Sequence, residues 1–129
     1  MYRKLVLPLI VVAALAILVV ALPSNPFPLQ QEEVRIIMAD GAWKRLPEQE
    51  YFRPSEIVVV LGVNNTVIWT NEDFSGRALH DVVSEDGIFM SGLLAPGETW
   101  AFTFEELGEY PYHCDPHPWM EGRVIVKTE

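Results

Sequence analysis

A short segment near the C-terminus carries three side chains of metal-binding type. Cys114, His117 and Met120 follow one another at steps of three residues, so a thiol, an imidazole and a thioether lie within seven residues. Thiolate and thioether ligands are soft and select copper over harder metals. Two imidazoles, one thiolate and a weakly bound methionine form the ligand set of a blue-copper site. The segment therefore predicts a copper site that still needs a second imidazole.

The second imidazole must come from one of two remaining histidines, His80 and His113. Neighbouring side chains of an extended strand point to opposite faces. If Cys114 points inward, His113 beside it points away. His80, which lies 34 positions upstream at an expected strand end, is therefore the better ligand. The predicted metal site is His80, Cys114, His117 and Met120.

Short β-strands are the elements expected to position these ligands. From residue 34 onward, β-rich runs alternate with turn residues, and no stretch has a helical period over three turns, which is typical of an all-β domain. Residues 40–53 show no clear period and are expected to form an irregular crossover. Seven or eight strands between residues 34 and 127 predict a two-sheet β-sandwich with Greek-key connections. The expected strands are 34–39, 57–61, 66–71, 79–84, 88–91, 99–104, 109–114 and 123–127.

The chain resembles the cupredoxins, most closely their amicyanin and plastocyanin branch. The resemblance covers essentially all of 55–127, with His80 standing alone upstream of the loop that begins Tyr110-Pro-Tyr112-His113-Cys114 and contains His117 and Met120. It implies one type 1 copper ion, with Cys114, His80 and His117 as equatorial ligands and Met120 as the axial ligand. It also implies that the protein passes single electrons between redox partners, which would dock near His117 and Trp119.

Two carboxylates distinguish this sequence from many of the proteins that it resembles. Asp81 follows the first histidine ligand and Asp115 follows the cysteine, where related proteins often have Asn, Ser or Thr. The resemblance implies hydrogen bonds between the two ligand loops at these positions. Because negative charge favours Cu(II), we expect the two aspartates to lower the reduction potential.

The N-terminal part of the chain predicts export and membrane attachment. Arg3 and Lys4 precede an uninterrupted apolar run of eighteen residues, Leu5 to Leu22, which is close to the length that spans a bilayer. A retained anchor over 1–22 is favoured over a cleaved signal peptide on that length. A Pro-rich linker, 23–33, and the cupredoxin domain, 34–129, would then lie on the extracytoplasmic side, periplasmic or extracellular.

Composition narrows the remaining functions. The formal net charge is −9, and all eighteen acidic residues follow residue 31, which argues against nucleic acid as a ligand. The single cysteine, Cys114, excludes an intramolecular disulfide. An electron carrier is favoured over an enzyme. The alternatives are a small copper enzyme that acts on a molecule such as nitric oxide at an open axial position, and a copper storage or delivery protein.

Overall fold

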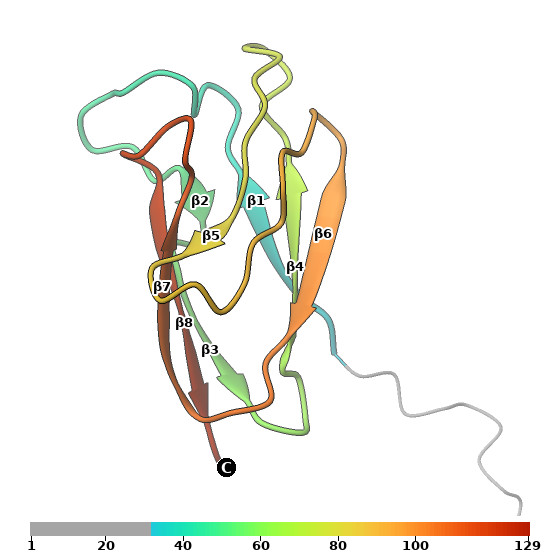
Figure 1. Cartoon of the computed structure of the whole chain (residues 1–129). Coiled ribbons are helices and arrows are strands. Elements are labelled where there is room, and N and C mark those ends of the chain that lie inside the picture. Colours follow the sequence, from blue (N-terminus) through green and yellow to red (C-terminus); the bar gives the residue numbers. More distant parts are fainter. Residues whose placement is uncertain (1–31) are drawn as a thin grey trace, which may run out of the picture.

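The protein, described here from a computed structural model over residues 32–129, is a sandwich of two four-stranded sheets (Figure 1). The first sheet has the strand order β2-β1-β4-β6 and the second has the order β3-β8-β7-β5. The strands are β1 (Val34–Met38), β2 (Phe52–Arg53), β3 (Glu56–Val60), β4 (Thr66–Asn71), β5 (Val83–Ser84), β6 (Thr99–Thr103), β7 (Gly108–His113) and β8 (Glu121–Lys127).

The connections place several loops at one end of the sandwich. Strand β1 runs parallel to β4 and β3 runs parallel to β8, whereas the other pairs are antiparallel. Every connection from β2 to β7 crosses between the sheets. The loops that follow β1, β4 and β7 consequently meet at the end opposite the C-terminus (Figure 1). The predicted metal ligands lie on two of these three loops.

The alternation of side chains explains how the two sheets form one core. Along β4, every second residue is buried, from Val67 through Trp69 to Asn71, as the sequence predicts. The ring of Trp69 packs edge-on against Tyr112 of the other sheet, with ring centroids 5.6 Å apart. Phe52 contacts the same tyrosine ring edge-on at 4.9 Å. These aromatic contacts lock together the strands that lead into the ligand-bearing loops.

The predicted all-β, two-sheet fold is confirmed for the described residues, but some boundaries are wrong. The expected strand over 79–84 is reduced to β5, and 88–91 takes part only in an isolated bridge between Val83 and Met90. The loop containing His80 turns toward the ligand site, so only one bridge, to Leu94, pairs this segment before β5. The crossover over 40–53 ends in strand β2, which pairs with β1.

The N-terminal predictions fall mostly outside the described residues. The anchor over 1–22 and all but the last two residues of the linker over 23–33 precede residue 32. Over 32–129 the chain has no helix of the length and apolar character that crossing a membrane requires.

Candidate metal centre

Three of the four predicted ligands converge at the loop-bearing end of the sandwich. The Sγ atom of Cys114 lies 3.7 Å from Nδ1 of His80 and 3.7 Å from Nδ1 of His117. All three ligand atoms lie within 4.8 Å of one another. His80 and Cys114 are fully buried, whereas His117 is partly exposed. One sulfur and two nitrogens therefore face a common point, with one imidazole edge toward solvent.

Met120 belongs to the same closed loop. The backbone N–H of Cys114 donates to the carbonyl of Met120 at 3.1 Å, and the N–H of Met120 donates to the carbonyl of His117 at 2.9 Å. These bonds bend the segment back on itself, and the Met120 side chain is fully buried. The three-residue steps between Cys114, His117 and Met120 thus form a tight turn, and Met120 lies inside the fold.

His113 is not part of this cluster, as the strand alternation predicts. It ends β7 half-buried, with its Nδ1 2.6 Å from Glu85 and its Nε2 2.7 Å from Asp115. Although burial lowers the pKa of His113, the hydrogen bonds that its ring donates to Asp115 and Glu85, together with the charges of these carboxylates, raise this pKa above its usual value. Both ring nitrogens are therefore occupied by carboxylates, and the imidazole that joins Cys114 and His117 in the cluster is that of His80.

Burial shifts the pKa values of two of the clustered side chains, Cys114 and His117. Burial raises the pKa of the Cys114 thiol to about 12, so a cation that binds there must displace its proton. Burial, followed by the nearby charge of His80, lowers the pKa of His117, which keeps its imidazole neutral and able to bind metal at neutral pH. A thiol that gives up its proton to a bound cation, two imidazoles and a buried thioether nearby are the donors that fit copper.

Asp81 joins the two ligand segments. Its Oδ1 accepts a hydrogen bond of 2.7 Å from the backbone N–H of Asp115, directly after Cys114. Asp81 is buried, with 6% exposure. The expected link between the segments is therefore present, and it runs from a side chain to the backbone. The side chain of Asp115 takes no part in this link and bonds to His113 instead.

A residue that the sequence gives no reason to select, Asp73, contacts the site most directly. Its Oδ2 lies 2.8 Å from Nε2 of His80, and both side chains are completely buried. Nothing in the local sequence separates it from the other acidic residues, because two of its partners, Gly41 and Trp43, reach it from the segment after β1. Its carboxylate also accepts hydrogen bonds from the backbone N–H groups of Gly41, Trp43 and Gly76.

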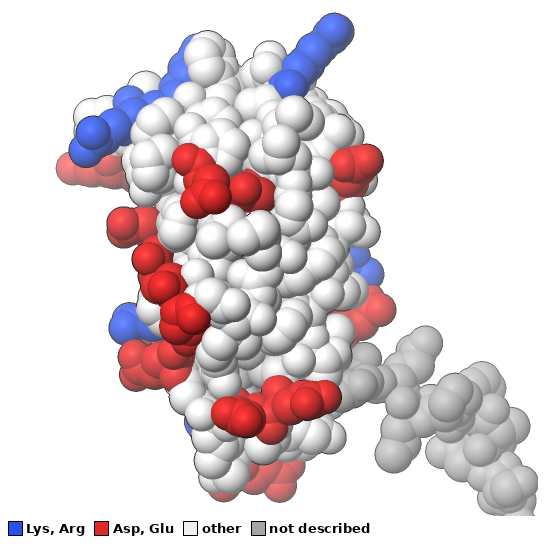
Figure 2. Space-filling view, in the orientation of Figure 1, with Lys and Arg blue, Asp and Glu red and all other residues white. Residues whose placement is uncertain are grey.

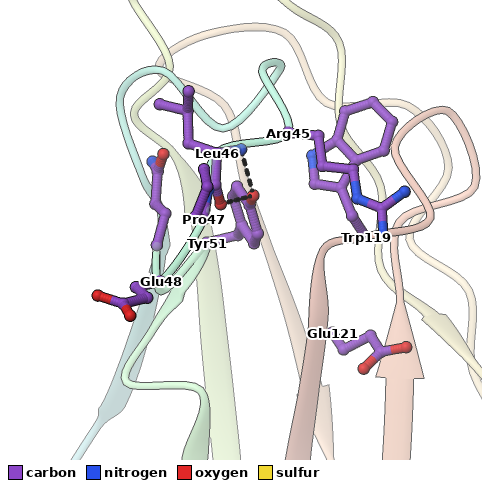
Figure 3. A pocket seen from close by; sticks show the side chains of 8 residues that line it. Arg45, Leu46, Pro47, Glu48, Tyr51, Trp119 and Glu121 are labelled. Carbon is purple, nitrogen blue, oxygen red and sulfur yellow. Dashed lines mark hydrogen bonds between the residues drawn. The ribbon is translucent and has the colours of Figure 1, made fainter.

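Trp119 connects the ligand loop to the segment that follows β1. Its indole N–H donates to the carbonyl of Ala42 at 3.0 Å, and its ring lies edge-on to His117 with centroids 5.3 Å apart. Beside Trp119 lies an open hollow of about 600 Å³ (Figure 3). Tyr51 holds one wall of the hollow by donating to the carbonyl of Leu46 and accepting from its N–H, both at 2.8 Å. The hollow contains none of the three clustered ligands.

Comparisons with known proteins agree with this architecture. Residues 10–126 match the family model described as a cupredoxin-like domain. Amicyanin from Paracoccus versutus is 31% identical over 96 residues, which covers 70% of this chain and 68% of that protein. The structure of a purple cupredoxin from Nitrosopumilus maritimus superposes with a TM-score of 0.64 at 31% identity, covering 73% of this chain and 99% of that one. A copper-containing nitrite reductase from Thermus scotoductus gives a TM-score of 0.60 at 27% identity, covering 76% of this chain but 23% of the enzyme.

Proposed function

This chain belongs to the cupredoxin-like domain family, and from that premise we propose that it carries single electrons on one type 1 copper ion. The observation that carries the proposal is the convergence of His80, Cys114 and His117, with ligand atoms within 4.8 Å of one another. We propose these three residues and the buried Met120 as the copper ligands. Bound there, copper would supply the Cu(I)/Cu(II) couple.

The protein's own residues explain why such a site suits electron transfer. His80 is fixed by Asp73 and by a reciprocal backbone pair with Leu94, and Cys114 follows directly on β7. A ligand set held by strands and buried hydrogen bonds changes little between charge states, and small reorganisation favours rapid electron transfer. His117 is the only one of the four proposed ligands that reaches the surface, so it offers a route for the electron out of the buried cluster.

We propose that redox partners dock at the end that carries His117 and Trp119. Two exposed aromatic side chains lie on loops at this end, Trp43 at 41% and Phe74 at 61% exposure. Apolar surface of this kind suits the small, short-lived interfaces of redox complexes. Lys and Arg side chains gather at the same end in Figure 2, whereas acidic side chains line the flank. The net charge of −9 therefore does not by itself predict the charge of the partner's contact surface.

The central experiment adds Cu(II) to the full-length chain and records visible absorption and electron paramagnetic resonance. An intense thiolate-to-copper band with narrow hyperfine splitting is expected for the wild-type chain, as is its loss in Cys114→Ser and His80→Ala. His113→Ala is the matched control, because it removes a neighbouring histidine outside the cluster and should retain the band. A wild-type chain without a coloured complex, or with one unchanged by Cys114→Ser, refutes the proposal.

The burial of Met120 favours the carrier over the copper enzyme that the sequence leaves as an alternative. A reactive centre needs a coordination position open to water or substrate, and a fully buried methionine beside the cluster leaves little space for one. Exposing the reduced copper-loaded chain to nitric oxide tests this directly. Conversion of nitric oxide to product would support the enzyme, and an unchanged gas with a reversible Cu(I)/Cu(II) couple would support the carrier.

We further propose that the domain is tethered on the extracytoplasmic face of the cell membrane. The support is in the sequence, where Arg3 and Lys4 precede the apolar run from Leu5 to Leu22. Expression with this segment should place the chain in the membrane fraction, with its domain accessible to protease from the outer side. A soluble product whose sequence begins after Leu22 would instead indicate a cleaved signal peptide.

A further inference from the structure

Asp73 is a buried carboxylate whose four hydrogen-bond donors come from two connections, the one between β1 and β2 and its own between β4 and β5. Oδ1 accepts from the N–H of Gly41 at 2.9 Å and of Gly76 at 3.2 Å. Oδ2 accepts from the N–H of Trp43 at 3.0 Å and from Nε2 of His80 at 2.8 Å. Each oxygen thus accepts two hydrogen bonds, and neither is accessible to solvent. A fully buried carboxylate is costly unless it is bonded in this way.

The contact with His80 determines which ring nitrogen faces the cluster. A carboxylate accepts but does not donate, so it selects the tautomer of His80 that carries its proton on Nε2. The other nitrogen, Nδ1, then has a free lone pair, and this is the atom 3.7 Å from the sulfur of Cys114. Partners of this kind orient metal-binding histidines and raise their basicity.

The Asp73 carboxylate also supports the imidazole of His117, indirectly and through the backbone around Ala42. Its bonds to Gly41 and Trp43 fix both sides of Ala42. The carbonyl of Ala42 in turn accepts the indole N–H of Trp119, whose ring packs edge-on against His117. One buried group therefore supports His80 directly and His117 through two further contacts.

We infer that Asp73 is the positioning residue of the metal centre: it selects Nδ1 of His80 as the metal-binding atom and places a permanent negative charge behind that ligand. This inference rests on the proposed copper function. Because the charge favours the oxidised ion over the reduced ion, Asp73 lowers the reduction potential and strengthens Cu(II) binding. A purely structural carboxylate would hold the two connections together without either effect.

Asp73→Asn is the sharpest test, because the amide keeps the size of the side chain and removes its charge. Only the oxygen of the amide can accept, whereas its nitrogen donates. If the nitrogen replaces Oδ1, two backbone N–H groups lose their acceptor, and if it replaces Oδ2, His80 is forced into the other tautomer. We expect Cu(II) affinity, measured by competition with a chelator in the full-length chain, to fall about 10- to 100-fold. The reduction potential should rise, because Cu(II) loses more stabilisation than Cu(I).

Asp40→Asn is the matched control. Asp40 also joins the segment after β1 to the loop after β4, since its Oδ1 accepts from the N–H of Ser75 at 2.7 Å, but this bond is exposed and His80 is not a partner. The control should keep the wild-type affinity and potential. Equal shifts in both variants would assign the effect to general loop packing and overturn the inference. So would a folded Asp73→Asn chain with wild-type affinity and potential.

A measurement on the metal-free wild-type chain keeps the inference testable if Asp73→Asn does not fold. The ¹⁵N chemical shifts of the His80 imidazole report its tautomer, and we expect the proton on Nε2. A proton on Nδ1 would overturn the inference whatever the copper results are. If the wild-type chain bound no copper but showed the Nε2 tautomer, the proposed function would fail while the orienting contact stood.

Discussion

Replacing Gly122 by alanine is expected to destabilise the domain, because the new methyl group would enter the ring of Tyr112. The two residues are directly paired between β7 and β8. A Cβ atom on Gly122 would lie 2.3 Å from both Cζ and the hydroxyl oxygen of this ring. Ordinary contacts begin near 3.4 Å, so the ring or the strand must shift by about 1 Å.

The surroundings of Tyr112 determine the size of the effect. The ring has 1% exposure and is held edge-on by Phe52, at 4.9 Å, and by Trp69, at 5.6 Å. A ring enclosed on several sides has no free direction in which to move. Forcing an additional methyl group into a packed core typically costs about 1–3 kcal/mol. In a domain of this size, each kcal/mol lowers the melting temperature by about 4–8 °C.

Urea denaturation of the metal-free chain, followed by tryptophan fluorescence, measures this loss. Gly76→Ala is the control, since its Cβ would lie 1.9 Å from the ring of Trp43, but that ring is 41% exposed and can turn outward. The control should lose less stability than Gly122→Ala, because Trp43 is partly exposed whereas Tyr112 is buried. The packing argument fails if Gly122→Ala is as stable as the wild type or no less stable than Gly76→Ala.

Three further substitutions test other contacts. Asp81→Asn should raise the copper reduction potential in voltammetry, because an amide oxygen can still accept from the N–H of Asp115 while the charge is lost; an unchanged potential would contradict this. Tyr110→Phe should lower the free energy of unfolding by about 1 kcal/mol, because it removes the 2.8 Å bond from the hydroxyl to the carbonyl of Glu106. Burial, followed by nearby carboxylate charge, raises the pKa of Tyr110 above its usual value near 10, so the stability from this group is complete below about pH 10 and falls as pH rises through the raised value. The Phe variant should therefore show a smaller alkaline loss in denaturation at several pH values, and an identical pH profile would count against this assignment. Asn71→Ala should cost about 2–3 kcal/mol in the same assay, because the buried carbonyl of Leu94 and the partly buried carbonyl of Ala78 lose their donor; a loss below about 0.5 kcal/mol would show that water or another group replaces it.

The sequence by itself determined the features whose causes are local. Cys114, His117 and Met120 are close in the chain, so a short turn is sufficient to bring them together, and their chemistry alone indicates copper. The period-two pattern of β4 predicted its buried face because strand geometry follows from the backbone. The same alternation separated His113 from Cys114 and left His80 as the predicted partner, and the structure places Nδ1 of His80 3.7 Å from the sulfur of Cys114.

Only the tertiary structure decided the features that depend on distant partners. Strand boundaries between 79 and 91 were wrong because the segment that carries His80 bends toward the cluster and loses most of its pairing. Asp73 was not identified because its role depends on Gly41 and Trp43 of the β1–β2 connection, which the fold brings to the buried point where Asp73 meets His80 of the β4–β5 connection. Composition and spacing describe which groups a chain can offer to a metal, whereas the burial and orientation of those groups arise only when the sheets pack.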